Sequence, residues 1–183
     1  RHSGGCGADR YAGERNYATV RIKGDNNVSA KSVLLEPQHL LDPDLEHTLI
    51  VVKPDGYARG LTGEILRRIE AKGYTIKGLK LMIASRELLA EHYADHKDKP
   101  FFEGLLEFMS SGPVVAIIVE GQRVVEGMRV LMGSTDPTTA PAGTIRGDLG
   151  RAWNSPHMEN LIHGSDSVDN ATREISLWFP EIY

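Results

Sequence analysis

Four short apolar runs alternate with helical patterns after the first quarter of the chain, and this order limits the folds open to it. Thr48–Val52 is a continuous, mostly β-branched run typical of a buried strand, and Val114–Val119 is the most strand-like run in the sequence. Tyr74–Ile83 and Leu161–His163 are expected to form two further strands. The order β-α-β-αα-β-α-β-α predicts an α/β (α+β sandwich) fold. We expect a ferredoxin-like βαββαβ antiparallel sheet with helices packed on it, on one face.

The intervals between the apolar runs carry the start and stop signals of helices. Apolar residues recur at every fourth position from Leu61 to Ile69, and Gly73 supplies a stop. Ser85 and Ser167 stand where the caps of two later helices are expected. These signals predict one helix or helical pair in each interval between the strands.

Two connecting segments are expected to be loops. Lys53–Gly56 follows the first strand, and residues 134–159 form a long stretch rich in Pro, Thr, Gly and Ala. The tripeptide Arg146-Gly147-Asp148 within that stretch is interpreted as part of a loop hairpin. A structureless segment of this length in a compact domain is usually functional, so residues 134–159 are expected to serve the site.

Length and composition favour one domain with an appendage. We expect the domain to occupy residues 46–183, and residues 1–45 to form an N-terminal extension and linker of unknown role. The net charge of −4 gives no reason to expect binding of nucleic acid or an anionic membrane. Cys6 is the single cysteine, which favours a reducing compartment, and no apolar run is long enough to span a bilayer. A cytoplasmic protein is therefore expected.

The stretch Asn160–Ser167 combines three features that suit a site for an anionic ligand. An apolar run ends in His163, Gly164 frees the backbone, and a Ser/Asp/Ser cluster then opens a helix. A side chain at this place faces the unpaired N–H groups and the positive dipole end of that helix. Glu174 lies about three helical turns into the helix, where a contact with the imidazole is geometrically possible. A single histidine is nevertheless more often structural than functional.

Basic residues at the ends of elements strengthen this interpretation. Lys53 ends the first strand, Arg129 lies on the helix before the long loop, and Arg146 lies within that loop. Taken singly, each would be a solvated surface charge. Together with Thr135 and His163 they would clamp a polyphosphate, because Arg supplies a rigid bidentate fork and Lys a mobile point charge.

Competing motifs are weaker. His92 and His96 have the i, i+4 spacing of a helical metal site, but no third ligand is evident, and exposed histidines are expected. Gly56–Gly60 lacks the Gly-Lys-Ser/Thr ending of a phosphate-binding loop. Tyr93 and Phe101 would by default be core aromatic residues.

Several motifs occur in the order seen in nucleoside diphosphate kinases, and the chain resembles that family from Glu46 to Tyr183. The most specific is His163-Gly164-Ser165-Asp166 with Thr144-Ile145-Arg146-Gly147-Asp148 upstream. The others are Lys53-Pro54-Asp55-Gly56, Arg59-Gly60-Leu61, Ser111-Gly112-Pro113 and Asn160-Leu161-Ile162.

The resemblance implies a ping-pong phosphoryl transfer that maintains nucleoside triphosphate pools. The γ-phosphate of ATP would pass to His163 and then to another nucleoside diphosphate, with Mg²⁺ carried by the nucleotide phosphates and no dedicated protein metal site. Ser165 and Glu174 would orient the histidine. Phe101 would stack on the base with Leu105 near it, which predicts broad nucleotide tolerance. The residues expected to bind the nucleotide are Lys53, Tyr93, Phe101, Leu105, Arg129, Thr135, Arg146 and Asn160.

The chain departs from the family pattern in two places. The segment between Asp148 and Asn160 is a few residues longer, and Met158-Glu159-Asn160 stands where Gly-Arg-Asn is common, which leaves base preference open. The chain also stops soon after Trp178-Phe179-Pro180, without the longer tail that contributes to subunit contacts in many eukaryotic members, which leaves open whether it forms a hexamer or a tetramer. A homo-hexamer is expected, with a tetramer as the alternative. A scaffold protein that keeps the pocket but acts through partners is the second hypothesis. Specific nucleic-acid binding is the third, and the acidic balance argues against it.

Overall fold

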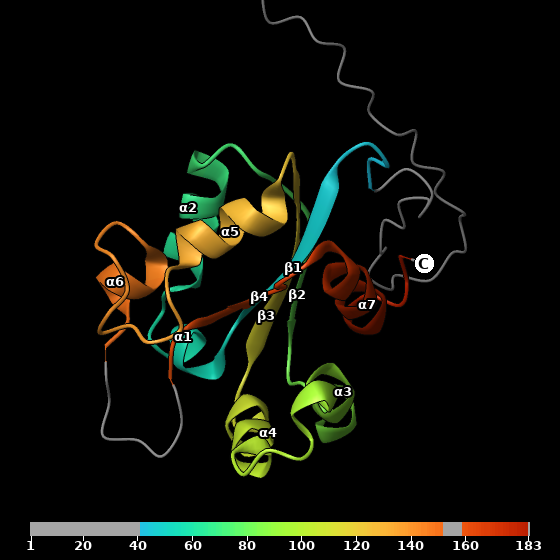
Figure 1. Ribbon diagram of the computed structural model, residues 1–183, viewed down its shortest axis with the longest axis vertical. Helices are drawn as coiled ribbons and strands as arrows, with labels where there is room; N and C mark the ends of the chain where they lie inside the picture. Colours follow the sequence, from blue (N-terminus) through green and yellow to red (C-terminus); the bar gives the residue numbers. More distant parts are fainter. Residues whose placement is uncertain (1–40, 152–158, 183) are drawn as a thin grey trace, which may run out of the picture. The chain divides into compact units, whose positions relative to one another are not determined.

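The computed structural model describes residues 41–151 and 159–182, and these residues form an antiparallel four-stranded sheet in the order β2-β3-β1-β4 (Figure 1). This topology confirms the expected ferredoxin-like fold. The strands are β1 (Glu46–Val52), β2 (Thr75–Met82), β3 (Val114–Gly121) and β4 (Ile162–Gly164). The helices are α1 (Pro54–Ala58), α2 (Thr62–Ala71), α3 (Arg86–His92), α4 (Phe102–Ser110), α5 (Val124–Met132), α6 (Ile145–Leu149) and α7 (Val168–Trp178), with a 3₁₀ turn, η2 (Ala94–His96).

Helices cover both faces of the sheet, so the expectation of helices on one face is wrong. Leu49 and Val51 pack into a core with α3, α4 and α7, whereas Ile50 and Val52 pack into a second core with α2 and α5. Figure 1 shows α2 and α5 on one side of the sheet and α7 on the other. Successive strand residues point to opposite faces, and a run without polar residues leaves both faces apolar. Each face therefore needs its own layer of helices.

The predicted helix ends are present. The Ser85 hydroxyl accepts from the backbone N–H of Leu88 at 3.2 Å, and the Ser167 hydroxyl accepts from Asn170 at 3.1 Å. Gly73 follows α2 with a φ of 93°, a left-handed conformation that favours glycine. These caps fix where the helices around the site begin and end.

Two segments that were expected to be loops are partly helical. Pro54 opens the short helix α1, because its fixed φ suits the first turn and its missing N–H is not needed there. Within residues 134–151, the Thr144 hydroxyl caps α6, so Arg146-Gly147-Asp148 lies on a helix and not in a hairpin. A Cβ at Gly147 would lie 2.0 Å from the Pro141 carbonyl oxygen, so only glycine fits this close approach. Residues 152–158 of the lengthened segment lie outside the described residues.

Only the end of the expected N-terminal extension lies within the described residues. Leu41 packs against the core formed with α7, and the Asp42 N–H donates to the Glu120 carboxylate at 2.8 Å. The prediction for residues 1–40 lies outside the described part of the chain. Among the described residues, no helix is long and apolar enough to cross a membrane.

Candidate functional site

A cavity of about 530 Å³ lies where β1 and β4 meet the helices α3, α4, α5 and α7. It brings together side chains that are up to 121 residues apart in sequence, from Lys53 to Glu174. All of the predicted site residues except Ser165 line it: Lys53, Tyr93, Phe101, Leu105, Arg129, Thr135, Arg146, Asn160, His163 and Glu174.

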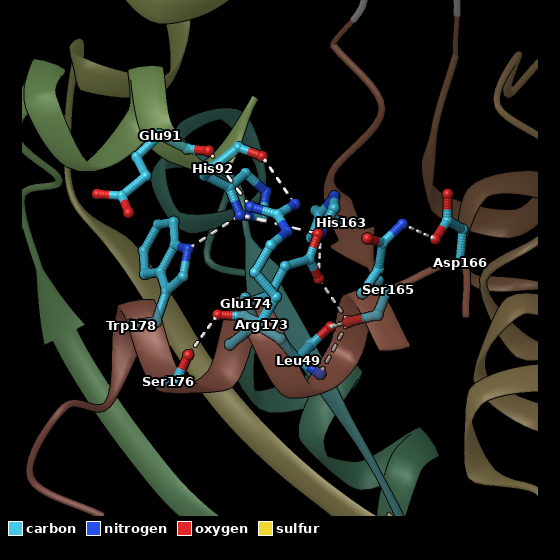
Figure 2. Close-up of polar contacts among 12 residues, drawn as sticks. Leu49, Glu91, His92, His163, Ser165, Asp166, Arg173, Glu174, Ser176 and Trp178 are labelled. Carbon is cyan, nitrogen blue, oxygen red and sulfur yellow. Dashed lines mark hydrogen bonds and ion pairs between the residues drawn. The ribbon is translucent and has the colours of Figure 1, made fainter. Parts of the chain in front are cut away.

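His163 is held by a carboxylate on the neighbouring helix. It lies on β4 opposite Val51 of β1, and its Nε2 is 3.3 Å from both oxygens of Glu174 on α7. The buried Glu174 carboxylate also accepts a hydrogen bond from the Ser165 hydroxyl at 2.5 Å, and Figure 2 shows both side chains converging on it. A carboxylate at Nε2 favours the neutral tautomer with its proton on Nε2, which leaves the Nδ1 lone pair available.

Lys53 and Asn160 form a buried polar link between the end of β1 and the start of β4. The Lys53 ammonium donates to Asn160 Oδ1 at 2.7 Å, and the Asn160 amide donates to the Thr135 carbonyl at 2.8 Å. Burial, and then the neighbouring Arg146, lower the pKa of Lys53 from 10.5 to about 8. The Lys53 ammonium is therefore held in position before an anion binds. Its pKa of about 8 means that it loses its proton at only mildly alkaline pH.

The two arginines differ in how they are held. Arg146 is buried and donates to the carbonyls of Gly133 at 3.0 Å, Asn160 at 3.1 Å and Ile162 at 2.6 Å. Burial, and then Arg129, lower its pKa to about 10. Arg129 is exposed, and the hydrogen bond found for it within the described residues is a long one, 3.5 Å to the Gly164 carbonyl. Arg146 thus ties together three backbone segments around the cavity through its hydrogen bonds. The guanidinium of Arg129 is less restrained by hydrogen bonds within the protein.

Two aromatic residues at the cavity have different environments. Tyr93 is buried, as expected for a core aromatic, and burial raises the pKa of its phenol. Phe101 is 55% exposed, so the default interpretation of it as a core residue is wrong, and its stacking on the base stays a prediction. It is the N-cap residue of α4, directly after Pro100, and its ring faces the exposed His96 with 5.6 Å between ring centroids. An exposed ring at the mouth of a cavity is a surface on which a planar ligand can stack.

The prediction of an exposed histidine is wrong for His92, which is only 4% exposed and also lines the cavity. The spacing of three between Leu89 and His92 places both on the buried face of α3, a signal that sequence reasoning missed. Other cavity residues that were not singled out for the site are Asp95, Phe108, Met132, Ile162, Gly164, Asn170 and Arg173.

Among the described residues, His92, His163 and Glu174 form the one group whose ligand atoms lie close enough for a metal ion. His92 Nδ1 is 3.8 Å from Glu174, but it already accepts the Trp178 indole N–H at 3.1 Å. A metal ligand needs that lone pair free, so the donor set fits a hydrogen-bonded network better than a metal centre.

Comparison with known proteins decides the family. The family model described as nucleoside diphosphate kinase matches residues 46–182. The chain belongs to the nucleoside diphosphate kinase family. The fold and the resemblance in sequence motifs are thereby confirmed, and the chain is a kinase that transfers phosphoryl groups.

Nucleoside diphosphate kinases from distant organisms share about half of their residues with this kinase. The enzyme of Acaryochloris marina is 56% identical over 135 residues, which is 74% of this chain and 88% of the relative. That of Mycobacterium avium is 56% identical over 137 residues, 74% of this chain and 98% of the relative. A solved structure of the Halobacterium salinarum nucleoside diphosphate kinase in complex with CDP aligns with a TM-score of 0.69 at 50% identity, covering 73% of this chain and 87% of that one.

Proposed function

We propose that this kinase works by a ping-pong mechanism through a phosphohistidine at Nδ1 of His163. The observation that carries the proposal is the contact of Nε2 with Glu174 at 3.3 Å inside a cavity whose lining includes the cationic side chains of Lys53, Arg129, Arg146 and Arg173. With the proton on Nε2, the Nδ1 lone pair is the nucleophile, and the carboxylate stabilises the positive charge that develops on the ring.

The transfer has two balanced halves. Nδ1 attacks the γ-phosphorus of ATP, a P–N bond forms, and the bond to the β,γ-bridging oxygen breaks with its electron pair leaving on ADP. A terminal phosphate oxygen of a second nucleoside diphosphate then attacks the same phosphorus, and the imidazole leaves with the electron pair of the P–N bond. Charge spreads over the equatorial oxygens at each transition state, and positioned cations stabilise it most there. Lys53, Arg129 and Arg146 are the cations we assign to this task.

The remaining cavity residues suit the nucleoside. Phe101 offers an exposed ring for the base, and Leu105 lies one helical turn later on the same wall. Thr135 and Asn160, with Tyr93, are assigned to phosphate and ribose contacts. Stacking reads no hydrogen-bonding edge of the base, so ATP and other nucleoside di- and triphosphates are all expected substrates. Such an exchange of phosphate among nucleotides maintains the triphosphate pools.

Mg²⁺ is the metal that we expect to accompany the nucleotide. Two exposed carboxylates among the described residues, Asp95 and Asp166, line the cavity, and a hydrated Mg²⁺ on phosphate oxygens fits such a rim. Bound with the nucleotide, the ion would neutralise phosphate charge. The protein's own part remains the positioning of the phosphates against His163.

Glu174→Gln is expected to slow phosphorylation of His163 about 100-fold with little change in nucleotide affinity. The amide keeps the size of the carboxylate but removes its charge, and its NH₂ would meet the Ser165 and His163 donors that now converge on oxygen. Rapid-quench kinetics with intact-mass detection measures this rate. Glu91→Gln, at an exposed position on the neighbouring helix α3, is the matched control, and a wild-type rate in Glu174→Gln would contradict the assigned role.

The pKa of Lys53, lowered to about 8 chiefly by burial, gives the reaction an alkaline limit. Below this pH the side chain is a cation that attracts phosphate, and above it the charge is lost. We therefore expect kcat/KM for the nucleotide to fall about tenfold per pH unit above pH 8. Lys53→Arg keeps the charge at high pH. Its profile, whatever its absolute rate, should lack this limb, and persistence of the limb would contradict the assignment.

One experiment tests the whole proposal without a second substrate. The protein is mixed with Mg-ATP alone, and intact mass is used to look for one added phosphoryl group. The adduct should be acid-labile, as phosphohistidine is, and should vanish when GDP is added. Binding of ATP without any adduct would overturn the proposed mechanism and favour the scaffold hypothesis.

We also propose that the kinase forms a homo-oligomer, a hexamer in preference to a tetramer. The strand β2 lies at one edge of the sheet; Leu79 and Leu81 on it are 51% and 58% exposed, and Ile83 directly after it is 68% exposed. An apolar edge strand of this kind is typical of a surface that pairs with another copy. Light scattering on the purified protein measures the number of subunits.

The proposed kinase domain remains residues 46–183, with residues 1–45 as an extension of unassigned role. The single cysteine and the nucleotide substrates support a cytoplasmic location. Specific binding of nucleic acid is not expected, because the net charge of −4 gives no reason for it.

A further inference from the structure

His92 is a buried polar residue that the proposed chemistry does not use. The residue is 4% exposed and its side chain lies at the junction of α3, α7 and β4. The Trp178 indole donates to its Nδ1 at 3.1 Å, and the Arg173 guanidinium donates to its backbone carbonyl at 3.4 Å, so α7 holds both ring and backbone (Figure 2). A side chain anchored twice in this way has a closely defined orientation.

The Trp178 hydrogen bond also defines the tautomer of His92, and burial favours its neutral form. Because Nδ1 accepts the indole hydrogen, the neutral ring carries its own proton on Nε2. Burial, and then the nearby His163, lower the pKa of His92 to about 2. Burial thus favours the uncharged ring, which does not compete with His163 for the charge of Glu174.

The anchored ring of His92 lies directly against the nucleophile. Its centroid is 4.6 Å from that of His163, with 76° between the planes, and the Tyr93 ring stands 6.2 Å from His163 at 84°. Glu174 contacts Nε2 of His163. The nucleophilic imidazole is thus bounded by two rings and held at one nitrogen, which restricts rotation about its side-chain bonds.

We propose that His92 is a positioning residue, whose ring holds the imidazole of His163 in the orientation that presents Nδ1 to the phosphate. This rests on the proposed phosphohistidine mechanism. A hydrogen bond to Glu174 fixes one point of the imidazole but still allows it to swing about that point. The edge contact with His92 supplies the second restraint, and misplacement of a reacting atom by about 1 Å can cost 100-fold in rate.

If His92 had a purely structural role, residue 92 would need only a hydrogen-bond acceptor and not a ring. If His92 only satisfied the Trp178 N–H, any acceptor at the position of Nδ1 would serve, and asparagine places its Oδ1 there. His92→Asn therefore keeps the hydrogen bond and removes the ring. Trp178→Phe does the opposite, because it removes the hydrogen bond but keeps the ring of His92, which still packs against Tyr93 and His163 while Arg173 holds its backbone carbonyl. The two variants separate the roles.

The test compares the single-turnover rate of phosphoenzyme formation at saturating Mg-ATP, the ATP dissociation constant and the thermal midpoint. All assays are run well below the midpoint of the least stable variant. His92→Asn should form the phosphoenzyme roughly 10- to 100-fold more slowly with ATP affinity within about threefold of wild type. Trp178→Phe should lose thermal stability but keep a rate within about threefold of wild type.

A further variant tests for rescue by a ring. His92→Phe in the Trp178→Phe background restores an aromatic edge without leaving an indole N–H unpaired, and should recover most of the rate lost in His92→Asn. A wild-type rate in His92→Asn, or an equal loss in Trp178→Phe, would overturn the proposal. Wild-type protein in the same experiment tests the mechanism itself, since absence of any phosphoenzyme there would show that the proposed function, and not the role of His92, had failed.

Discussion

Replacing His163 with alanine is expected to abolish phosphoryl transfer while leaving nucleotide binding nearly intact. The substitution removes the nitrogen that forms the P–N bond, and removal of a catalytic nucleophile typically costs on the order of 10⁴- to 10⁶-fold in kcat. The cations that we assign to the phosphates lie on other elements: Lys53 follows β1 and Arg129 lies on α5. Intact mass after mixing with Mg-ATP measures the loss of the adduct, and calorimetry measures the retained affinity.

A matched control for this variant is His47→Ala. His47 lies on β1, and its Nε2 contacts Glu120 at 2.9 Å rather than any group of the cavity. That variant should form the phosphoenzyme at the wild-type rate. A phosphorylated His163→Ala protein would contradict the mechanism outright, because the phosphate would then reside on another side chain.

Arg146→Ala is expected to lose both stability and activity, in contrast to Arg129→Ala. The buried guanidinium of Arg146 donates to three backbone carbonyls, and a buried polar group left unpaired costs about 1–3 kcal/mol. We expect unfolding free energy to fall by about 3 kcal/mol. Transfer at the remaining folded sites should fall roughly 100- to 1000-fold, as for loss of one preorganised donor.

Arg129→Ala separates these effects, because Arg129 is exposed and its hydrogen bond within the described residues is a long one, 3.5 Å to the Gly164 carbonyl. Its rate should fall to a similar extent while its unfolding free energy changes by less than about 0.5 kcal/mol. Urea denaturation and steady-state kinetics on the two variants measure this contrast. Equal stability of both variants would contradict the structural role assigned to Arg146.

The strands and helix caps were predictable because they depend on local sequence. Buried strands need apolar β-branched residues, as in Val114–Val119, and caps need a hydroxyl at a fixed place, as at Ser85 and Ser167. The short helix α6 was missed because five residues carry too little periodicity to distinguish a helix from a loop. Its stability comes from the Thr144 cap and from the buried Ile145.

The residues that line the cavity were predictable, but the contacts between them were not. The family motifs named the cavity residues, while periodicity and spacing alone left Lys53, Arg129 and Arg146 as ordinary surface charges. The burial of His92 depends on Trp178, a residue 86 positions away in sequence, and no local pattern reveals such a partner. The prediction of helices on one face was wrong because the face that a helix covers depends on how the chain crosses the sheet. The unbroken apolar strands nevertheless favoured helices on both faces.

The backbone around Leu161 sets the distance between the lysine and the nucleophile. Leu161 has a φ of 71°, which costs a non-glycine residue about 1 kcal/mol, and its surroundings hold it there. Its carbonyl accepts from the N–H of Lys53 at 2.9 Å, its own N–H donates to Asp55 at 3.0 Å, and a Cβ at Gly56 would lie 2.8 Å from its carbonyl oxygen. These contacts hold the chain around Lys53 against Leu161, which lies two residues before His163. The Lys53 backbone therefore cannot shift along the strand that carries His163. The spacing between the Lys53 backbone and the strand that carries His163 is therefore fixed before a nucleotide binds.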